Sequence, residues 1–307
     1  MLVAEKNRLP FRPIEITDRE MVWRYTSVYG ENSCQCVFAS MFTQQDQYGE
    51  QICEYDGVLY ILRSGLETET HRVYQAPMGE KLRTAYERIL NDAAAYGKKA
   101  KFVTVTERHS IFLAENFPGR FEITENRDYA EYFYENQRMV SLAGGGLMTK
   151  RRCLYLFERM YGDKAVIAPI TPADFPDILD CMQIWVEQGR KTIDEAMLTH
   201  SVTLVKRQLE YYEALGLRGI AVRIDGKLRG FIYGAPSSED CVDAMIGKAD
   251  RNVEHLFKKM YQEFSRMLEK EYKFVNWEED CGSEGLRSMK LSYQPCKLMK
   301  KYLAEER

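Results

Sequence analysis

The sequence predicts an α+β protein that uses one fold twice in tandem, each copy being a mostly antiparallel mixed sheet flanked by helices. Two observations support this. Each half contains an Asp-Gly turn, at Asp56-Gly57 and at Asp225-Gly226. In each half the turn is followed, at similar spacing, by a further glycine, a helical run and a short Lys-Phe-Val strand. A repeat of this length is a domain-level duplication, because a solenoid unit spans only about 20–50 residues.

We expect an N-terminal domain over 1–164 and a C-terminal domain over 165–307. The N-terminal domain would end in a connector over 126–164, which the second half does not copy. A chain of 307 residues fits two domains of about 150 residues each. Its hydrophobic share of 45% and charged share of 29% are typical of globular proteins, with enough apolar residues for two modest cores.

The first half is expected to start with an extended, proline-bearing segment over 9–13 and a helix that begins near Thr17. Residues 58–62 then form the return strand of a hairpin with a type I′ turn. The apolar residues of 80–96 recur at helical spacing, whereas 101–106 alternate as in a strand. The remaining expected elements are a helix over 109–116 and a strand over 121–124.

The second half repeats this order. Its hairpin is expected over 219–224 and 228–234, on either side of the second Asp-Gly turn. Before it come two helices, and the second of these is expected to end at Gly216 as its C-cap. The further expected elements are helices over 175–188, 198–215, 252–270 and 283–290, and strands over 242–246 and 273–277.

Composition narrows the function classes. A net charge of −3 and a pI near 6.0 argue against a surface built for non-specific nucleic-acid binding. They do not exclude a local basic groove. The eight cysteines show no Cys-x-x-Cys spacing and the four histidines no ligand spacing, so we expect no metal site. The short apolar start Leu2-Val3-Ala4 is broken by charges, and no stretch approaches the ~20 apolar residues that span a bilayer. We therefore expect a cytoplasmic protein with reduced thiols.

The densest polar block runs from Asn276 to Pro295. Three acids, Glu278 to Asp280, leave the end of an expected strand, and two glycines flank the start of a short helix. Strand ends that lead into such helices hold ligands in open sheets, because free N–H groups there point at anions. Arg287 and Lys290 are three apart and share a face of that helix. The alternative is a solvated acidic turn followed by an amphipathic helix, in which the charge pairing is structural.

Two further blocks are candidates. Lys248, Asp250 and Arg251 lie in the link from a strand to a long helix, which Asp250 or Asn252 can cap. In the connector, the aromatic stretch 126–132 and the glycine triplet 144–146 precede Lys150-Arg-Arg152. Aromatic and arginine side chains stack on bases while lysines meet phosphates, which suits the end of a tRNA or a phospholipid headgroup. A solvated connector between domains explains the same residues equally well.

The order of elements resembles the Gcn5-related N-acyltransferase (GNAT) fold. In that fold the strand-to-helix link binds the pyrophosphate of coenzyme A through a Gln/Arg-x-x-Gly-x-Gly/Ala loop. Here Gly247 stands alone before Lys248, and the first copy has Gln75-Ala-Pro-Met-Gly79 instead. The fold thus resembles that of an acyltransferase without its usual coenzyme A signature. We expect no cofactor, and acyl-CoA stays open as the alternative.

Nearly the whole chain resembles the bacterial proteins related to the C-terminal domain of phosphatidylglycerol lysyltransferase. The resemblance rests on the stretch from Asn126 to Tyr132, on Leu-Ala-Gly ahead of Lys-Arg-Arg, on Gly-Lys-Ala-Asp, and on the block 278–295. It implies two GNAT-like domains in tandem, as in the Fem-type peptidyltransferases. Such relatives transfer an amino acid from aminoacyl-tRNA to a lipid hydroxyl or a peptidoglycan amine. The lysyltransferase itself also has a membrane-spanning half, to which this sequence has no counterpart.

Our first hypothesis is an aminoacyl- or acyltransferase whose site lies in the second copy. Its acceptor would be a small molecule, a peptide or a lipid headgroup. Such a reaction needs a base, stabilisation of an oxyanion and a proton for the leaving hydroxyl. The candidate catalytic residues are Glu278 or Asp280 as base or amine anchor, Lys248 as an anion stabiliser together with Arg287, and Tyr293 as the proton donor that the GNAT resemblance implies. The candidate substrate-binding residues are Arg287, Lys290, Asp250, Arg251, Lys150, Arg151 and Arg152, the last three for donor phosphates.

Two alternatives stay open. The first is a non-catalytic protein that uses a duplicated GNAT fold to bind a nucleotide, a tRNA end or a lipid headgroup. The missing coenzyme A loop favours it, as does the lack of a nucleophile-and-base constellation. The second is a coenzyme A-dependent acetyltransferase with an unusual phosphate loop.

Overall fold

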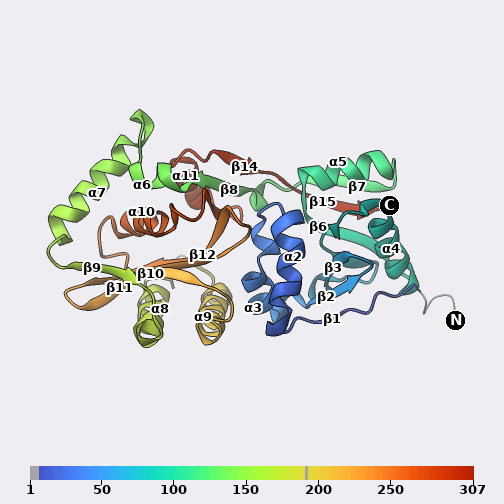
Figure 1. The fold of residues 1–307 in the computed structure, drawn as a ribbon, viewed down its shortest axis with the longest axis horizontal. Helices are drawn as coiled ribbons and strands as arrows, with labels where there is room; N and C mark the ends of the chain where they lie inside the picture. The colour runs from blue at the N-terminus through green and yellow to red at the C-terminus, as the bar shows by residue number, and fades with distance from the viewer. Residues whose placement is uncertain (1–6, 191–192) are drawn as a thin grey trace. The chain divides into compact units, whose positions relative to one another are not determined.

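The computed structural model describes residues 7–190 and 193–307 and divides into two compact units, each with its own sheet (Figure 1). The first unit comprises Met1–Glu131, Glu279–Arg287 and Leu298–Arg307. The second comprises Tyr132–Glu278 and Ser288–Lys297. The N-terminal stretch Leu2-Val3-Ala4, which supported the expected cytoplasmic location, lies outside the described residues.

The first unit is built on a sheet of order β1-β2-β3-β4-β6-β15-β7, in which β5 also pairs with β3. Its helices confirm the expected ones, with an additional helix α3 that the sequence analysis did not assign. The strands are β1 (Arg12–Pro13), β2 (Glu50–Tyr55), β3 (Val58–Arg63), β4 (His71–Tyr74), β5 (Met78–Gly79), β6 (Lys99–Thr106), β7 (Phe121–Glu125) and β15 (Lys301–Glu306). The helices are α2 (Arg19–Tyr29), α3 (Phe38–Tyr48), α4 (Leu82–Ala95) and α5 (Glu107–Asn116).

The second unit has a sheet of order β14-β8-β13-β12-β11-β10-β9. Its strands are β8 (Glu131–Glu135), β9 (Ala165–Pro169), β10 (Arg218–Ile224), β11 (Lys227–Pro236), β12 (Cys241–Ala249), β13 (Phe274–Glu279) and β14 (Lys297–Met299). Its helices are α6 (Asn136–Ser141), α7 (Met148–Tyr161), α8 (Phe175–Gly189), α9 (Glu195–Glu210) and α10 (Leu256–Leu268), and α11 (Glu284–Leu291) follows β13.

The two sheets repeat the same pairing pattern, as the duplication predicts. A hairpin, β2-β3 or β10-β11, is joined by an antiparallel strand, β4 or β12. That strand then pairs in parallel with β6 or β13, across helix α4 or α10. Both hairpin turns are of the predicted kind: Asp56 and Gly57 have φ of 52° and 72°, and Asp225 and Gly226 have φ of 50° and 76°. A type I′ turn needs positive φ at both central positions.

One strand of each sheet comes from an unexpected part of the chain. In the first sheet β15, at the C-terminal end of the chain, lies between β6 and β7 and is antiparallel to both. In the second sheet the corresponding place, between β13 and β14, is taken by β8. The division therefore falls at Glu131, and not at the predicted 164/165 boundary. The segment 132–164, predicted as a connector of the first domain, belongs to the second unit as part of β8 together with α6 and α7.

The sheet of the second unit is covered on both faces (Figure 1). Helix α10 packs so closely on one face that a Cβ at Gly230 of β11 would lie 2.5 Å from the sulfur of Met260. Helices α8 and α9 lie on the other face, where the rings of Tyr212 and Tyr233 are 6.0 Å apart. Two predicted helix ends were wrong: α10 begins at Leu256, and α9 ends at Glu210, so Gly216 closes the turn after the helix.

Candidate functional site

Strands β12 and β13 stop pairing before either of them ends. Their parallel ladder covers Cys241–Asp243 against Phe274–Asn276, whereas β12 continues to Ala249 and β13 to Glu279. A register shift in the pairing of β12 with β11 lies close to the point of separation. Bulges of this kind occur next to active sites, because they bend a strand and redirect its side chains. The separated ends of β12 and β13 are therefore a candidate site in the second unit.

The last rung before the separation consists of two polar residues, Asp243 and Asn276, which are both fully buried. The Asn276 side-chain oxygen accepts a hydrogen bond of 2.8 Å from the backbone N–H of Glu278. Burying a carboxylate beside an amide is costly unless the surroundings compensate for it. Sequence analysis chose neither residue as a candidate, although Asn276 begins the polar block and a carboxylate inside the apolar strand 242–246 is a signal that can be recognised.

Lys248 lies on the separated end of β12, with its ammonium 3.6 Å from the centre of the Trp185 ring on α8. Burial lowers the pKa of Lys248 to about 8, and the negative charge of Glu278 acts in the opposite direction. An ordinary lysine has a pKa near 10.4 and is almost entirely protonated at neutral pH. Lys248 instead has a substantial neutral fraction near pH 8, so its amine can accept a proton.

Glu278 lies on the separated end of β13 in a left-handed backbone conformation, with φ of 56°. For a residue other than glycine this conformation costs about 1–3 kcal/mol and is found most often at functional sites. The ammonium of Lys290 holds the local backbone, because it donates to the carbonyls of Trp277 at 2.5 Å and Glu278 at 3.2 Å. Lys290 is itself buried, so the structure favours a tethering role for it over the predicted contact with substrate.

The negative charge of Glu278 also acts on Tyr261 of α10. Burial first, and then the charge of Glu278, raise the pKa of Tyr261 to about 12. Its ring stacks on Trp277 with centres 4.1 Å apart. The phenol is therefore neutral at physiological pH, and the charge of Glu278 acts on both Lys248 and Tyr261. These three groups come from β12, β13 and α10, which no local sequence pattern connects.

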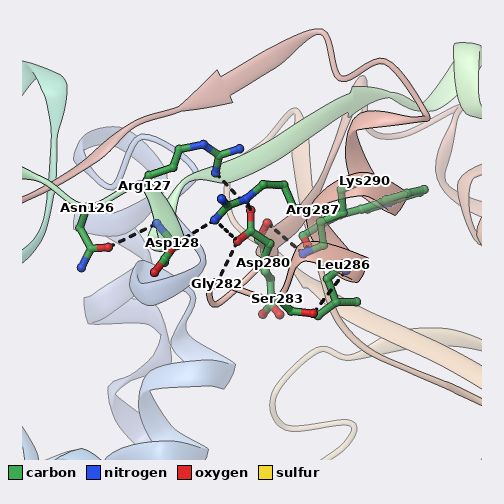
Figure 2. A network of polar contacts seen from close by, with 11 residues as sticks. Asn126, Arg127, Asp128, Asp280, Gly282, Ser283, Leu286, Arg287 and Lys290 are labelled. Carbon is green, nitrogen blue, oxygen red and sulfur yellow. Dashed lines mark hydrogen bonds and ion pairs between the residues drawn. The ribbon is translucent and has the colours of Figure 1, made fainter. Parts of the chain in front are cut away.

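Asp280 and Arg287 form an ion-paired network in the first unit (Figure 2). Oδ1 of Asp280 accepts from Arg287 Nη2 at 2.8 Å and from the Gly282 N–H at 3.0 Å. Oδ2 accepts from Arg287 Nε at 3.0 Å and from Arg127 Nη1 at 3.1 Å. Arg287 also binds Asp128 at 2.7 Å. Because each oxygen of the buried Asp280 already accepts two hydrogen bonds, the geometry favours a structural role over the predicted base and anion-binding roles.

Asp250 closes the turn that follows β12. Its Oδ1 accepts from the side chain of Gln188 at 2.7 Å and the N–H of Asn252 at 2.9 Å, and its Oδ2 pairs with Arg229 at 3.0 Å. Burial tends to raise the pKa of Asp250, but these partners outweigh it and the pKa is lowered. The N–H of Arg251 donates to Gln188 at 2.9 Å. The predicted capping of the long helix by Asp250 is wrong, because α10 begins at Leu256 with His255 as its N-cap, whereas the backbone N–H bound by Asp250 lies in the preceding turn. Asp250 and Arg251 both have protein partners.

The predicted cluster of Lys150, Arg151 and Arg152 points in three directions. Lys150 turns inward, where its ammonium donates to Ser292 at 2.7 Å and lies 4.3 Å from the centre of the Tyr293 ring. Arg151 donates to the backbone carbonyls of Leu142 and Gly144, while Arg152 is exposed on the outer side of α7. The three cations therefore do not form one phosphate clamp.

Tyr293 is only 3% exposed and packs edge-on against Trp277, with ring centres 5.0 Å apart. Burial raises the pKa of Tyr293 well above its usual range. A side chain so enclosed reaches a substrate only if its surroundings move. Of the predicted catalytic residues, Lys248 and Glu278 interact through their charges. Tyr293 instead has a packing role.

In the part of the chain that the structure describes, no helix combines the length and the apolar character needed to cross a membrane. Over residues 7–190 and 193–307 there is likewise no group of three or more His, Cys, Asp or Glu side chains that could hold a metal ion.

Comparisons with known proteins place the chain in a family. Residues 26–305 match the family model described as "Phosphatidylglycerol lysyltransferase, C-terminal". A conserved protein of unknown function from Bacteroides thetaiotaomicron has a similar structure, with a TM-score of 0.91 and 27% identity over 97% of this chain and 100% of that chain. The structure of L-PGS from Bacillus licheniformis matches with a TM-score of 0.66 and 14% identity, covering 94% of this chain and 92% of that one. No curated protein matches.

A tandem GNAT protein from the clavulanic acid biosynthesis pathway also matches, with a TM-score of 0.51 and 11% identity over 97% of this chain and 98% of that one. The fold predicted from the sequence, two GNAT-like domains in tandem, is thereby confirmed. At such low identity the likeness shows the fold alone.

Proposed function

The chain belongs to the family of the phosphatidylglycerol lysyltransferase C-terminal domain, and we propose that it is an aminoacyltransferase. It moves an aminoacyl group from aminoacyl-tRNA to an amine or hydroxyl acceptor. The observation that carries this proposal is the partly neutral Lys248, which lies with Glu278 on the separated ends of β12 and β13.

The reaction requires one proton to be moved. The nitrogen or oxygen of the acceptor attacks the ester carbonyl carbon of the aminoacyl-tRNA, and a new carbon–nitrogen or carbon–oxygen bond forms. The bond from that carbon to the ribose oxygen then breaks. The acceptor loses a proton and the ribose oxygen gains one, so a single group can take the proton and deliver it. A general base works best when its pKa lies near the operating pH, and the Lys248 amine meets that condition.

Glu278 completes the pair. Once Lys248 has taken the proton, the carboxylate of Glu278 stabilises the resulting ammonium, because its charge raises the pKa of Lys248. Its strained backbone, tethered by Lys290 and Asn276, fixes where that carboxylate can lie. Rigid placement of charge before the reaction is the main way in which proteins stabilise a transition state.

The loop between β12 and α10 argues for a donor other than coenzyme A. Where the GNAT fold offers backbone N–H groups to a pyrophosphate, here the carboxylate of Asp250 accepts the N–H of Asn252. A negative charge already occupies that position, and it is held there by Arg229 and Gln188. Binding a second anion at the same N–H groups would bring like charges together. The acetyltransferase alternative loses support on this ground.

A direct test uses a mixture of radiolabelled aminoacyl-tRNAs with a panel of amines and phosphatidylglycerol vesicles as acceptors. We expect acceptor-dependent loss of label from the tRNA for the wild-type protein, and a loss of rate of at least about 100-fold for Lys248→Ala, as is typical when a general base is removed. Lys206→Ala, on the exposed surface of α9, is the matched control and should leave the rate unchanged. Binding of tRNA without turnover by the wild-type protein would instead support the non-catalytic alternative.

A further inference from the structure

Helix α7 carries a stripe of exposed side chains along its outer side. The stripe consists of Met148, Arg152, Tyr155 and Arg159, which follow one another at intervals of four, three and four residues. This spacing places all four on one side of an α-helix. Met148 is 66% exposed and Tyr155 61%, which are high values for large apolar side chains. Arg159 lies 5.9 Å from the centre of the Tyr155 ring, so cation and aromatic alternate within one surface.

The inner side of the same helix explains why the stripe stays outside. Leu154 and Phe157 are buried in the core cluster of the second unit, together with residues of α10 and of the sheet. The helix therefore cannot turn to bury the α7 stripe without removing these two side chains from the core. Figure 1 shows α7 at the border of its unit, on the side of α10.

The charge of α7 is opposite to that of the chain. Its cations exceed its acids by 4 − 1 = 3, whereas the whole protein has a net charge of −3. The single acid, Glu158, forms an ion pair with Lys259 of α10, so it does not offset the stripe. Lys258 of α10 adds a further positive charge nearby. The pKa of Lys150 is lowered mainly by burial and secondly by the charge of Lys258. The cations of α7 are Lys150, Arg151, Arg152 and Arg159.

We propose that the α7 stripe is a docking surface for an anionic lipid bilayer. The two arginines meet the lipid phosphates, while Met148 and Tyr155 enter the boundary between headgroups and acyl chains. Helices that lie in a membrane interface combine these two features, basic residues for anionic lipids and exposed apolar or aromatic residues for the boundary. Docking needs no turnover, so this inference goes beyond the proposed aminoacyl transfer and does not rest on it.

Two other occupants fit the surface less well. An RNA backbone would bind the arginines but would gain little from a thioether that is 66% exposed. A second copy of this chain would bring two α7 helices, each with a net charge of +3, against one another, and like charges repel. The combination of positive charge and exposed apolar surface therefore favours a bilayer.

The test is co-sedimentation with vesicles of phosphatidylcholine alone or of phosphatidylcholine mixed equally with phosphatidylserine. Phosphatidylserine supplies negative charge without being the lipid that names the family, so docking is measured separately from any acceptor binding. We expect binding to the mixed vesicles only, weakening as salt is raised. A basic residue near an anionic surface contributes about five- to sixfold to binding, so Arg152→Glu with Arg159→Glu should weaken it by at least about 30-fold.

The matched control is Lys206→Glu with Lys227→Glu, which changes the net charge by the same amount at two exposed positions of the same unit. It should leave binding within about twofold of wild type, because these residues lie outside the stripe. Met148→Ser with Tyr155→Ser should weaken binding while keeping its salt dependence. If the double glutamate variant fails to fold, Arg152→Gln with Arg159→Gln takes its place.

Three results would overturn the proposal. The first is that the wild-type protein fails to bind the mixed vesicles. The second is that the stripe variants bind these vesicles as well as the control variant does. In the third, the stripe variants lose binding to deacylated tRNA while vesicle binding is unchanged, which would make the stripe a nucleic-acid surface.

Discussion

Glu131 and Lys301, the first residues of strands β8 and β15, form an ion pair of 2.6 Å in which neither side chain is exposed. Both residues belong to the first unit. The Lys301 ammonium also donates to Ser33 at 2.5 Å and Gln35 at 3.1 Å, and Glu131 accepts from the Cys34 N–H at 2.9 Å. One buried ion pair thus holds the first residues of β8 and β15, the two strands whose places in the sheets were not expected.

Removing one partner of this pair should be strongly destabilising. Glu131→Gln leaves the Lys301 ammonium buried without its counter-charge, and such a change costs about 3–5 kcal/mol. We expect the free energy of unfolding in urea to fall by that amount. Glu131→Leu combined with Lys301→Met should recover most of the loss, since an apolar replacement of the whole pair is often neutral. A loss below about 1 kcal/mol for Glu131→Gln would contradict the assignment.

The lowered pKa of Lys248 makes stability depend on pH. In the unfolded chain its pKa returns to about 10.4, so between pH 8 and pH 10.4 the unfolded state binds more protons than the folded state. The free energy of unfolding should therefore increase as the pH is raised from about 8 to about 10.4. Below about pH 8 the buried ammonium of Lys248 destabilises the folded state. Lys248→Met should stabilise the protein at pH 7, by up to about 3 kcal/mol, and should remove its share of the pH dependence. Urea unfolding at several pH values measures this, and a less stable Lys248→Met protein at pH 7 would count against a strained, desolvated amine.

Glu278→Gln should lower the pKa of Lys248 further, because it removes the negative charge that now opposes the effect of burial. The same substitution should lower the pKa of Tyr261, which that charge raises. NMR titration of the two side chains follows both shifts in one experiment. Glu279→Gln, one residue further along, is the comparison that separates a specific effect from a general change of charge. If Glu278→Gln leaves both titrations unchanged, the electrostatic coupling described above is absent.

The network around Asp280 should matter for stability and not for the acid–base chemistry. Asp280→Asn removes a buried charge that holds Arg287 and Arg127, and we expect a loss of about 2–4 kcal/mol. The midpoint of the pH–rate profile should stay where it is in the wild-type protein. The same stability with a lost rate would show that Asp280 is the base after all.

Some features of the fold were visible in the sequence because local chemistry dictates them. Asp56-Gly57 and Asp225-Gly226 tolerate the positive φ of a type I′ turn, so both hairpins could be predicted. The place of β15 between β6 and β7 could not, because alternation of side chains shows that a strand exists but not which sheet receives it. The predicted domain boundary differs from the observed division because 132–164, which holds most of β8 together with α6 and α7, was assigned to the first domain.

The same limit applies to the site. Lys248 and Glu278 were candidates from their positions after strands, but the contact of Lys248 with Trp185 joins residues that are 63 positions apart in the sequence. Asp280 and Arg287 were chosen as charged neighbours, and the structure shows each of them already paired. Sequence patterns find charges near a strand end, but only packing shows which of them are already paired.

The role of Lys248 can be tested by the pH dependence of single-turnover aminoacyl transfer from tRNA, for the wild-type protein and for Lys248→Ala. If the neutral amine of Lys248 is the base, the wild-type rate rises with pH and levels off around a midpoint near pH 8, while Lys248→Ala is slow at every pH and shows no such rise. A Lys248→Ala protein with the wild-type rate and the wild-type midpoint would contradict the central claim.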